Sequence, residues 1–166
     1  MKKQKELIRY VTRAALVAAL YVVLTMVSAV FGLSSGAVQV RISEALCILP
    51  VFMPEATVGL FLGCLLSNLM VSGVVIWDVI FGSLATLIGA VGAYMLRRLP
   101  EKFMWCATLP TVISNALIIP PVLIFAYGES KAYIIVLALV TAGELISATG
   151  LGSVLYYALK KRNVKF

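Results

Sequence analysis

Long apolar runs, broken only by short polar segments, constrain this chain more than any other feature. One run extends from Ala14 to Phe31, and comparable runs recur towards the C-terminus. A bilayer core of about 30 Å requires roughly 20 predominantly apolar residues in a helix that crosses it. The chain is 62% hydrophobic and only 13% charged, whereas soluble domains are about 45–50% apolar and about 25% charged. The sequence therefore predicts an all-α, polytopic membrane protein.

Turn-forming residues divide the apolar sequence into six predicted transmembrane helices within a single membrane domain, residues 1–166. Gly32 and Gly36 mark one break, and Pro54 marks another. Since the second predicted helix is short for a full crossing, a four-span arrangement with a re-entrant second and third helix remains an alternative. The predicted helices cover residues 10–31, 40–53, 55–71, 77–97, 103–127 and 132–159.

Basic residues gather at both ends of the chain and between the fourth and fifth predicted helices. Cytoplasmic loops of membrane proteins carry an excess of Lys and Arg, so both termini are predicted to be cytoplasmic. The net charge of +7 does not indicate nucleic-acid binding, because the basic groups flank apolar runs and are not interleaved with aromatic residues. The clusters are Lys2, Lys3, Lys5, Arg9 and Arg13; Arg97, Arg98 and Lys102; and Lys160, Lys161, Arg162 and Lys165.

Several classes of function lack their usual residues in this sequence. The chain contains no histidine, the commonest general base, and no G-x-x-x-x-G-K-[ST] phosphate loop. The three cysteines, Cys47, Cys64 and Cys106, lie in apolar segments and are predicted to be free and buried. We therefore predict a protein that is not an enzyme and holds no metal or cofactor, and any energised role would require partner proteins.

Polar side chains inside the predicted helices are the candidates for a ligand site. A charged group at a helix centre costs about 2.5–3.5 kcal/mol on insertion scales. Glu144, near the middle of the last predicted helix, is the clearest case, although a protonated or salt-bridged packing carboxylate is the alternative. Asn115 and Asn68 either contact a ligand or join helices by hydrogen bonds.

Further candidates lie towards the predicted outer ends of the helices. Asp78 either favours the helix dipole or contacts a ligand, and Trp77 fits an interfacial aromatic belt or a ligand contact. Arg41 and Glu44 are three residues apart, so on a helix they share a face and either pair with each other or face a ligand. One outward-opening pocket of mixed polarity is predicted to hold these groups, together with Gln39, Phe81 and Tyr127.

The segment V-R-I-S-E-A-L from Val40 to Leu46, followed by Leu49-Pro50 and later by Trp77-Asp78, resembles the QueT family. These proteins are substrate-binding (S) components of energy-coupling factor (ECF) transporters and are linked to queuosine precursors. The resemblance covers essentially the whole chain, and R-I-S-E-A-L is its specific part. It implies a 7-deazaguanine substrate, such as the 7-aminomethyl or 7-cyano compound, and a bacterial plasma-membrane complex with a transmembrane coupling subunit and two ATPases.

A substrate of this class suggests roles for the candidate residues. A guanine-like edge offers two adjacent N–H donors that a carboxylate accepts in bidentate fashion. Glu144 is the predicted acceptor, with Glu44 as the alternative. The other predicted roles are donation to the ring carbonyl by Asn115 or Gln39, stacking on the base by Trp77 or Tyr127, and balancing of an aminomethyl cation by Asp78.

The resemblance also implies a docking surface for the coupling subunit, formed by an A-x-x-x-A pattern on the first helix. Ala14 with Ala18 and Ala15 with Ala19 both match, and close packing within the chain is the alternative explanation. Two other functions remain open: a stand-alone secondary transporter, which would work without an ATPase partner, and an S component for another vitamin-like small molecule.

Overall fold

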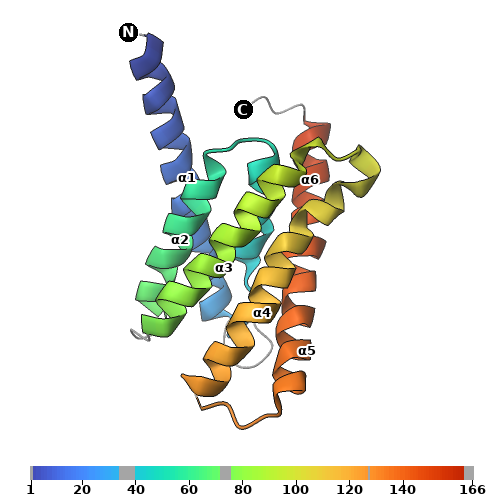
Figure 1. Cartoon of the computed structure of the whole chain (residues 1–166). Coiled ribbons are helices and arrows are strands. Elements are labelled where there is room, and N and C mark those ends of the chain that lie inside the picture. Colours follow the sequence, from blue (N-terminus) through green and yellow to red (C-terminus); the bar gives the residue numbers. More distant parts are fainter. Residues whose placement is uncertain (1, 34–39, 72–75, 127, 163–166) are drawn as a thin grey trace.

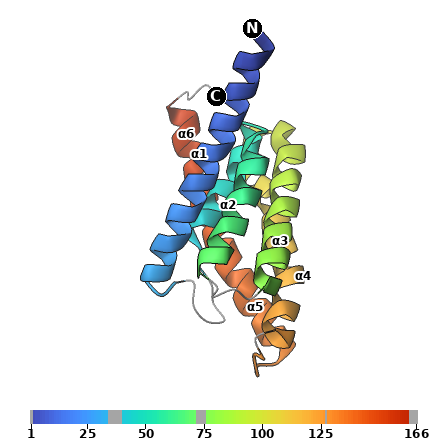
Figure 2. The same ribbon diagram turned by 90° about the vertical axis from the view of Figure 1, so that its left-hand side faces the viewer.

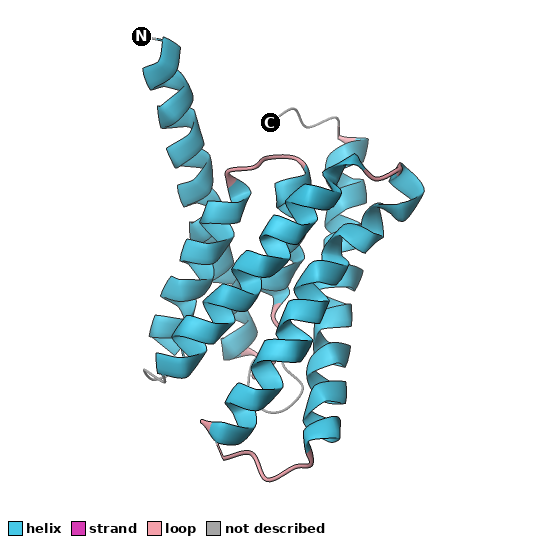
Figure 3. Ribbon diagram, in the orientation of Figure 1, coloured by secondary structure: helices cyan, strands magenta, loops and turns pink. Residues whose placement is uncertain are grey.

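The computed structural model describes residues 2–33, 40–71, 76–126 and 128–162, and nearly all of them are helical (Figure 3). This confirms the predicted all-α class. Elements η1, η2 and η3 are 3-10 helices, and η4 is a π-helix. In chain order the elements are α1 (Lys2–Val30), η1 (Ile42–Val51), α2 (Ala56–Val71), α3 (Ile76–Met95), η2 (Leu96–Arg98), η3 (Glu101–Thr108), α4 (Leu109–Phe125), α5 (Tyr133–Glu144), η4 (Leu145–Leu151) and α6 (Gly152–Lys161).

The six predicted helical segments all correspond to helices, with three differences in their extent. α1 begins at Lys2 rather than near residue 10, because Lys, Gln, Glu and Leu at its start are good helix formers. The fifth segment is divided into η3 and α4, with Pro110 in the first turn of α4, where a missing N–H is tolerated. The sixth is divided into α5, η4 and α6.

Within the described residues, four helical stretches are long and apolar enough to cross a membrane by length and composition. They comprise Lys3–Val30, Ile76–Arg98, Glu101–Phe125 and Tyr133–Lys161. Ile42–Val51 and Ala56–Met70 are shorter apolar helices. The structure thus supports a multi-pass membrane protein with four helices of spanning length.

The short helix η1 lies at the centre of the molecule. All its residues from Ser43 to Pro50 are buried, and it packs against α1, α3, α6 and η4. Its first turn is anchored on α1, since the backbone N–H of Ile42 donates to Ser28 Oγ at 3.0 Å. Around this centre α2, α3, α4 and α5 follow one another side by side in chain order (Figure 1).

One end of the bundle carries the basic clusters. The N-terminal end of α1, the connection from α3 to η3 and the C-terminal end of α6 all lie there (Figure 1). An ion pair between Lys160 and Glu101 joins α6 to η3 at this end. The first turns of α1 extend beyond the other helices (Figure 2) and their side chains are exposed from residue 3 to residue 12.

Small residues allow α1 and α2 to approach closely. A Cβ placed on Gly59 would lie 2.5 Å from the carbonyl oxygen of Ala14, and one on Gly63 would lie 2.9 Å from that of Ala18. Ala14 and Ala18 are therefore buried against α2, whereas Ala15 and Ala19 are exposed. The predicted alternative of packing within the chain thus accounts for the first pair, and only the second pair is accessible to a partner.

We predict that Gly63→Ala destabilises the α1–α2 contact. The added methyl group would lie 2.7 Å from Tyr21 Cβ, and overpacking of this kind typically costs about 1–3 kcal/mol. Gly150→Ala is the matched control, because its nearest neighbour atom would lie at an ordinary 3.5 Å. Thermal unfolding of the two purified variants in detergent measures the difference, and equal midpoints would contradict the close packing.

Candidate ligand-binding site

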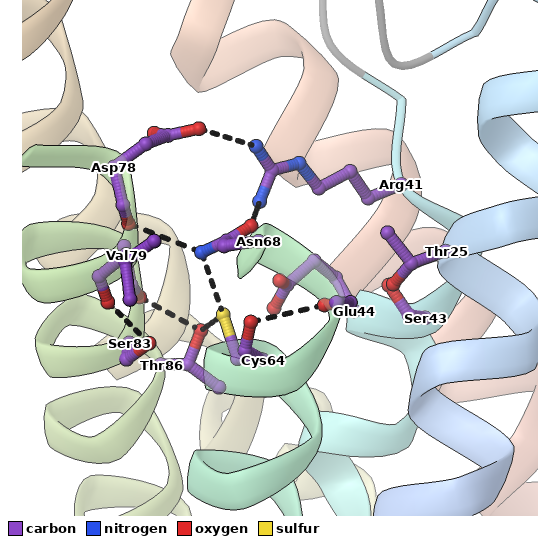
Figure 4. Close-up of polar contacts among 12 residues, drawn as sticks. Thr25, Arg41, Ser43, Glu44, Cys64, Asn68, Asp78, Val79, Ser83 and Thr86 are labelled. Atoms are coloured by element: carbon purple, nitrogen blue, oxygen red, sulfur yellow. Dashed lines mark hydrogen bonds and ion pairs between the residues drawn. The ribbon is translucent and has the colours of Figure 1, made fainter. Parts of the chain in front are cut away.

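Polar side chains that are far apart in the sequence come together at the beginning of η1 (Figure 4). Arg41 precedes η1, Asn68 lies near the end of α2, and Asp78 lies in the first turn of α3. The α4 and α5 helices add Asn115 and Glu144, both buried. The structure therefore gathers most of the predicted site residues in one region of the interior.

Arg41 is held by residues of the two neighbouring helices. Its Nη2 atom lies 3.9 Å from Oδ2 of Asp78, and its Nη1 atom donates to Oδ1 of Asn68 at 3.3 Å (Figure 4). The amide nitrogen of Asn68 donates in turn to the backbone carbonyl of Asp78 at 3.1 Å. Asp78, predicted to cap its helix or to face a ligand, thus serves as the ionic partner of Arg41.

Glu44 is a carboxylate whose two oxygens both accept hydrogen bonds from the chain. The hydroxyl of Tyr21 donates to Oε1, and the thiol of Cys47 donates to Oε2 at 3.0 Å. An ionised carboxylate is an acceptor only, so this pattern satisfies Glu44 from within the protein. These contacts favour a structural role for Glu44 over its predicted role as the alternative ligand acceptor.

Glu144 differs from Glu44 in one respect that bears on function. Its Oε2 atom is buried and has no hydrogen-bond partner within the described part of the chain. A buried polar atom left without a partner costs about 1–3 kcal/mol, and more when it is charged. Among the described residues Thr111 Oγ1 and Ser147 Oγ share this property, but they are neutral hydroxyls.

A small cavity lies between Glu144 and Arg41. Its lining consists of Arg41, Asn115, Ile119, Val140 and Glu144. The cavity is thus bordered by a carboxyl group, an amide, a guanidinium cation and two aliphatic side chains. This combination suits a flat ligand that carries hydrogen-bond donors along one edge and an acceptor beside them.

The cavity is narrow in this conformation. The space open to water-sized molecules is about 10 Å³, which corresponds to roughly one water molecule. A ligand larger than a water molecule therefore fits this cavity only if one of its walls moves. Glu144 ends α5 and is followed directly by the π-helix η4, a kind of helix irregularity that is frequent at functional sites.

A second, larger and apolar hollow of about 490 Å³ lies open at the surface between α3 and the C-terminal half of α4. Trp77 and Phe81 stack on one side of it with ring centroids 6.0 Å apart. Trp77 and Asp78 are successive residues, about 100° apart around α3, so Asp78 faces the interior while Trp77 is 52% exposed. The sequence predicted that Trp77 and Phe81 share one mixed pocket with the polar residues. The structure instead places these two side chains apart from the small polar cavity, so the prediction is wrong for them. The rest of the lining of the apolar hollow is Leu117, Ile118, Pro121, Val122, Phe125 and Ala126.

Two predicted site residues, Gln39 and Tyr127, lie outside the described residues. Conversely, Tyr21, the partner of Glu44, is not among the residues predicted from the sequence. A signal was present, because the polar residues Tyr21, Thr25 and Ser28 recur at helical spacing on one stripe of the first helix. All three are buried, and Thr25 Oγ1 hydrogen-bonds Ser43 Oγ at 2.8 Å.

Comparisons with known proteins agree with the resemblance seen in the sequence. Residues 11–161 match the family model described as QueT transporter. The queuosine precursor transporter QueT of Lactococcus lactis subsp. cremoris (strain MG1363) is 36% identical over 106 residues, which cover 63% of this chain and 60% of that relative. No solved structure matches the chain. The family match extends over most of the described helices, and the chain belongs to the QueT transporter family, a family of transporters rather than of enzymes.

Proposed function

We propose that this protein is the membrane-embedded S component of an ECF transporter and imports a queuosine precursor of the 7-deazaguanine class. Membership of a transporter family supports the transport role, and the printed name of the Lactococcus relative supports the substrate class. The resemblance of the sequence to S components supports the coupling subunit and the two ATPases as partners. At the site, one observation carries the proposal: the buried Glu144 Oε2 without a hydrogen-bond partner among the described residues.

The cavity offers the groups that a guanine-like base requires. Glu144 accepts hydrogen bonds from the adjacent ring N–H and exocyclic amino groups, and each bond is charge-assisted when the carboxylate is ionised. Asn115 borders the same cavity and contributes a polar contact. Ile119 and Val140 supply apolar surface for the faces of the ring.

The α4–α5 hairpin is the wall that moves to admit the base. Its side chains Ile119, Leu123, Val136 and Val140 form an apolar cluster of their own, and α5 packs chiefly on α4. The opposite wall is held by the contacts of Arg41 and Asn68. Next to Asn115, Ser114 Oγ donates to the carbonyl of Ala85 at 2.8 Å and fixes α4 to α3.

Glu144→Gln is predicted to weaken substrate binding without destabilising the protein. The new amide group places a donor against a ligand N–H. Loss of a hydrogen bond to a charged group is worth about 1.5–3 kcal/mol, so affinity should fall about ten- to a hundredfold. Calorimetric titration with 7-aminomethyl- and 7-cyano-7-deazaguanine measures this change.

Glu44→Gln is the matched comparison for that experiment. Its amide nitrogen would face either the Tyr21 hydroxyl or the Cys47 thiol, so thermal stability should fall by about 1–3 kcal/mol. If instead Glu144→Gln lost stability and kept its affinity, Glu144 would be a packing residue and the site assignment would be wrong.

Ala15→Trp is predicted to block docking of the coupling subunit. Ala15 and Ala19 are exposed on α1, and small residues permit the close helix contact that a tryptophan would prevent. Substrate affinity should persist, while co-purification with the coupling subunit and transport should be lost. Ala18→Trp should instead reduce folded yield, because Ala18 is buried against Gly63. Transport by Ala15→Trp without partner subunits would favour a stand-alone transporter.

For the topology we propose six crossings with both termini cytoplasmic in the bacterial plasma membrane, η1 and α2 included. The gathering of the basic clusters at one end of the bundle supports this orientation. Single cysteines at Lys3, Lys102 and Lys161, in a background without native cysteines, should be protected from an impermeant thiol reagent in intact cells. Cysteines at Leu33 and Ser130 should react, and labelling of Leu33 and Lys161 from the same side would contradict the six-span topology.

A further inference from the structure

We infer that Arg41 recognises the ring carbonyl of the substrate, and that Asn68 is the positioning residue that aims Arg41 at the cavity. The inference rests on the proposed function, since it concerns the same cavity. Donation to the ring carbonyl, predicted from the sequence for Asn115 or Gln39, thus falls to Arg41. The inference also makes the Arg41–Asn68 pair, rather than Glu144 alone, the source of selectivity among bases.

The first step is the order of groups along a guanine edge. The exocyclic amino group and the ring N–H are donors, and the carbonyl oxygen beside them is an acceptor. When Glu144 accepts from the two donors, the neighbouring oxygen requires a donor from the protein. Arg41 borders the same cavity as Glu144 and carries N–H groups in a rigid planar fork.

The second step concerns the other candidate donor. The amide nitrogen of Asn115 donates to the backbone carbonyl of Thr111 at 3.1 Å, within its own helix. That bond takes up one of the two N–H groups of the Asn115 amide. Arg41 also supplies a charge-assisted bond, which is about twice as strong as a neutral one.

The third step is how Arg41 is aimed. Asn68 accepts from Nη1 of Arg41 and donates to the Asp78 carbonyl, so it links the guanidinium to the backbone of α3. Its amide nitrogen also lies 3.5 Å from the Cys64 sulfur. Gly82 makes room for this arrangement, because a Cβ there would lie 2.8 Å from the Asn68 nitrogen. Asn68 is thus fixed from two helices and has little freedom to release Arg41.

The arrangement predicts discrimination by the group at the carbonyl position. A base with an amino group there would point donors at the donors of Arg41, which leaves buried polar groups unpaired. A thiocarbonyl keeps the neighbouring N–H but is a weaker acceptor. The 6-thioxo analogue of 7-aminomethyl-7-deazaguanine therefore tests the Arg41 contact while it leaves the donors to Glu144 in place.

The experiment is a calorimetric titration of the purified full-length protein with the oxo base and its 6-thioxo analogue. Wild type should bind the oxo base about tenfold more tightly, and Arg41→Lys, which keeps the charge beside Asp78, should reduce that ratio to about two or less. Asn68→Ala should weaken oxo binding about tenfold in wild type but less than about twofold in the Arg41→Lys background, since coupled residues are not additive. Ser83→Ala, whose hydroxyl bonds its own helix at Val79 O, is the control and should leave both affinities unchanged.

Each outcome decides between the two proposals. This inference is overturned if the ratio of oxo to thioxo affinity is unchanged in Arg41→Lys, or if Asn68→Ala weakens oxo binding equally in both backgrounds. The proposed function then remains intact when Glu144→Gln still weakens binding. Failure of wild type to bind either base contradicts the proposed function itself. If Arg41→Lys yields no folded protein, the test is the ratio of oxo to thioxo affinity in Asn68→Ala. A ratio near that of wild type overturns the inference, and a ratio of about two or less supports it.

Discussion

The burial of η1 from Ser43 to Pro50 is the constraint on which the other elements depend. The residues from Ser43 to Pro50 face protein on every side, so the neighbouring helices must enclose them. A 3-10 helix rises about 2.0 Å per residue against about 1.5 Å for an α-helix. The ten residues of η1 therefore extend about 20 Å, further than the same residues would reach as an α-helix. This geometry allows a short segment to connect the cavity region with the opposite part of the bundle.

The polar groups at the start of η1 show how buried charges are paired and hydrogen-bonded in this protein. Burying an isolated charge is expensive, so buried charges in proteins are paired and hydrogen-bonded. Arg41 follows that rule with Asp78 and Asn68, and Glu44 follows it with Tyr21 and Cys47. Glu144 stands apart because one oxygen has no partner among the described residues. The contrast between the two buried glutamates, rather than burial itself, is the reason why we propose Glu144 and not Glu44 as the ligand acceptor.

The sequence predicted the helical class and the approximate positions of the six helical segments, because apolar run length and turn residues are local signals. It did not predict the start of α1 at Lys2 or the division of the last two segments. It also selected Arg41, Asn115 and Glu144, since charged and amide groups in apolar helices are unusual enough to be noticed. It did not predict the partners of Arg41 and Glu44, because spacing within one helix carries no information about side chains from another. Local spacing likewise left open which of two alanine pairs on α1 faces α2.

The partners of Arg41 and Glu44 also differ in when the ribosome makes them. Tyr21, which bonds Glu44, belongs to α1 and is synthesised before η1. Asn68 and Asp78, which hold Arg41, belong to α2 and α3 and are synthesised after it. An unpaired arginine in apolar surroundings costs about 2.5–3.5 kcal/mol even on insertion scales. A nascent chain that ends before α3 therefore lacks Asp78, the ionic partner of Arg41 in the folded protein.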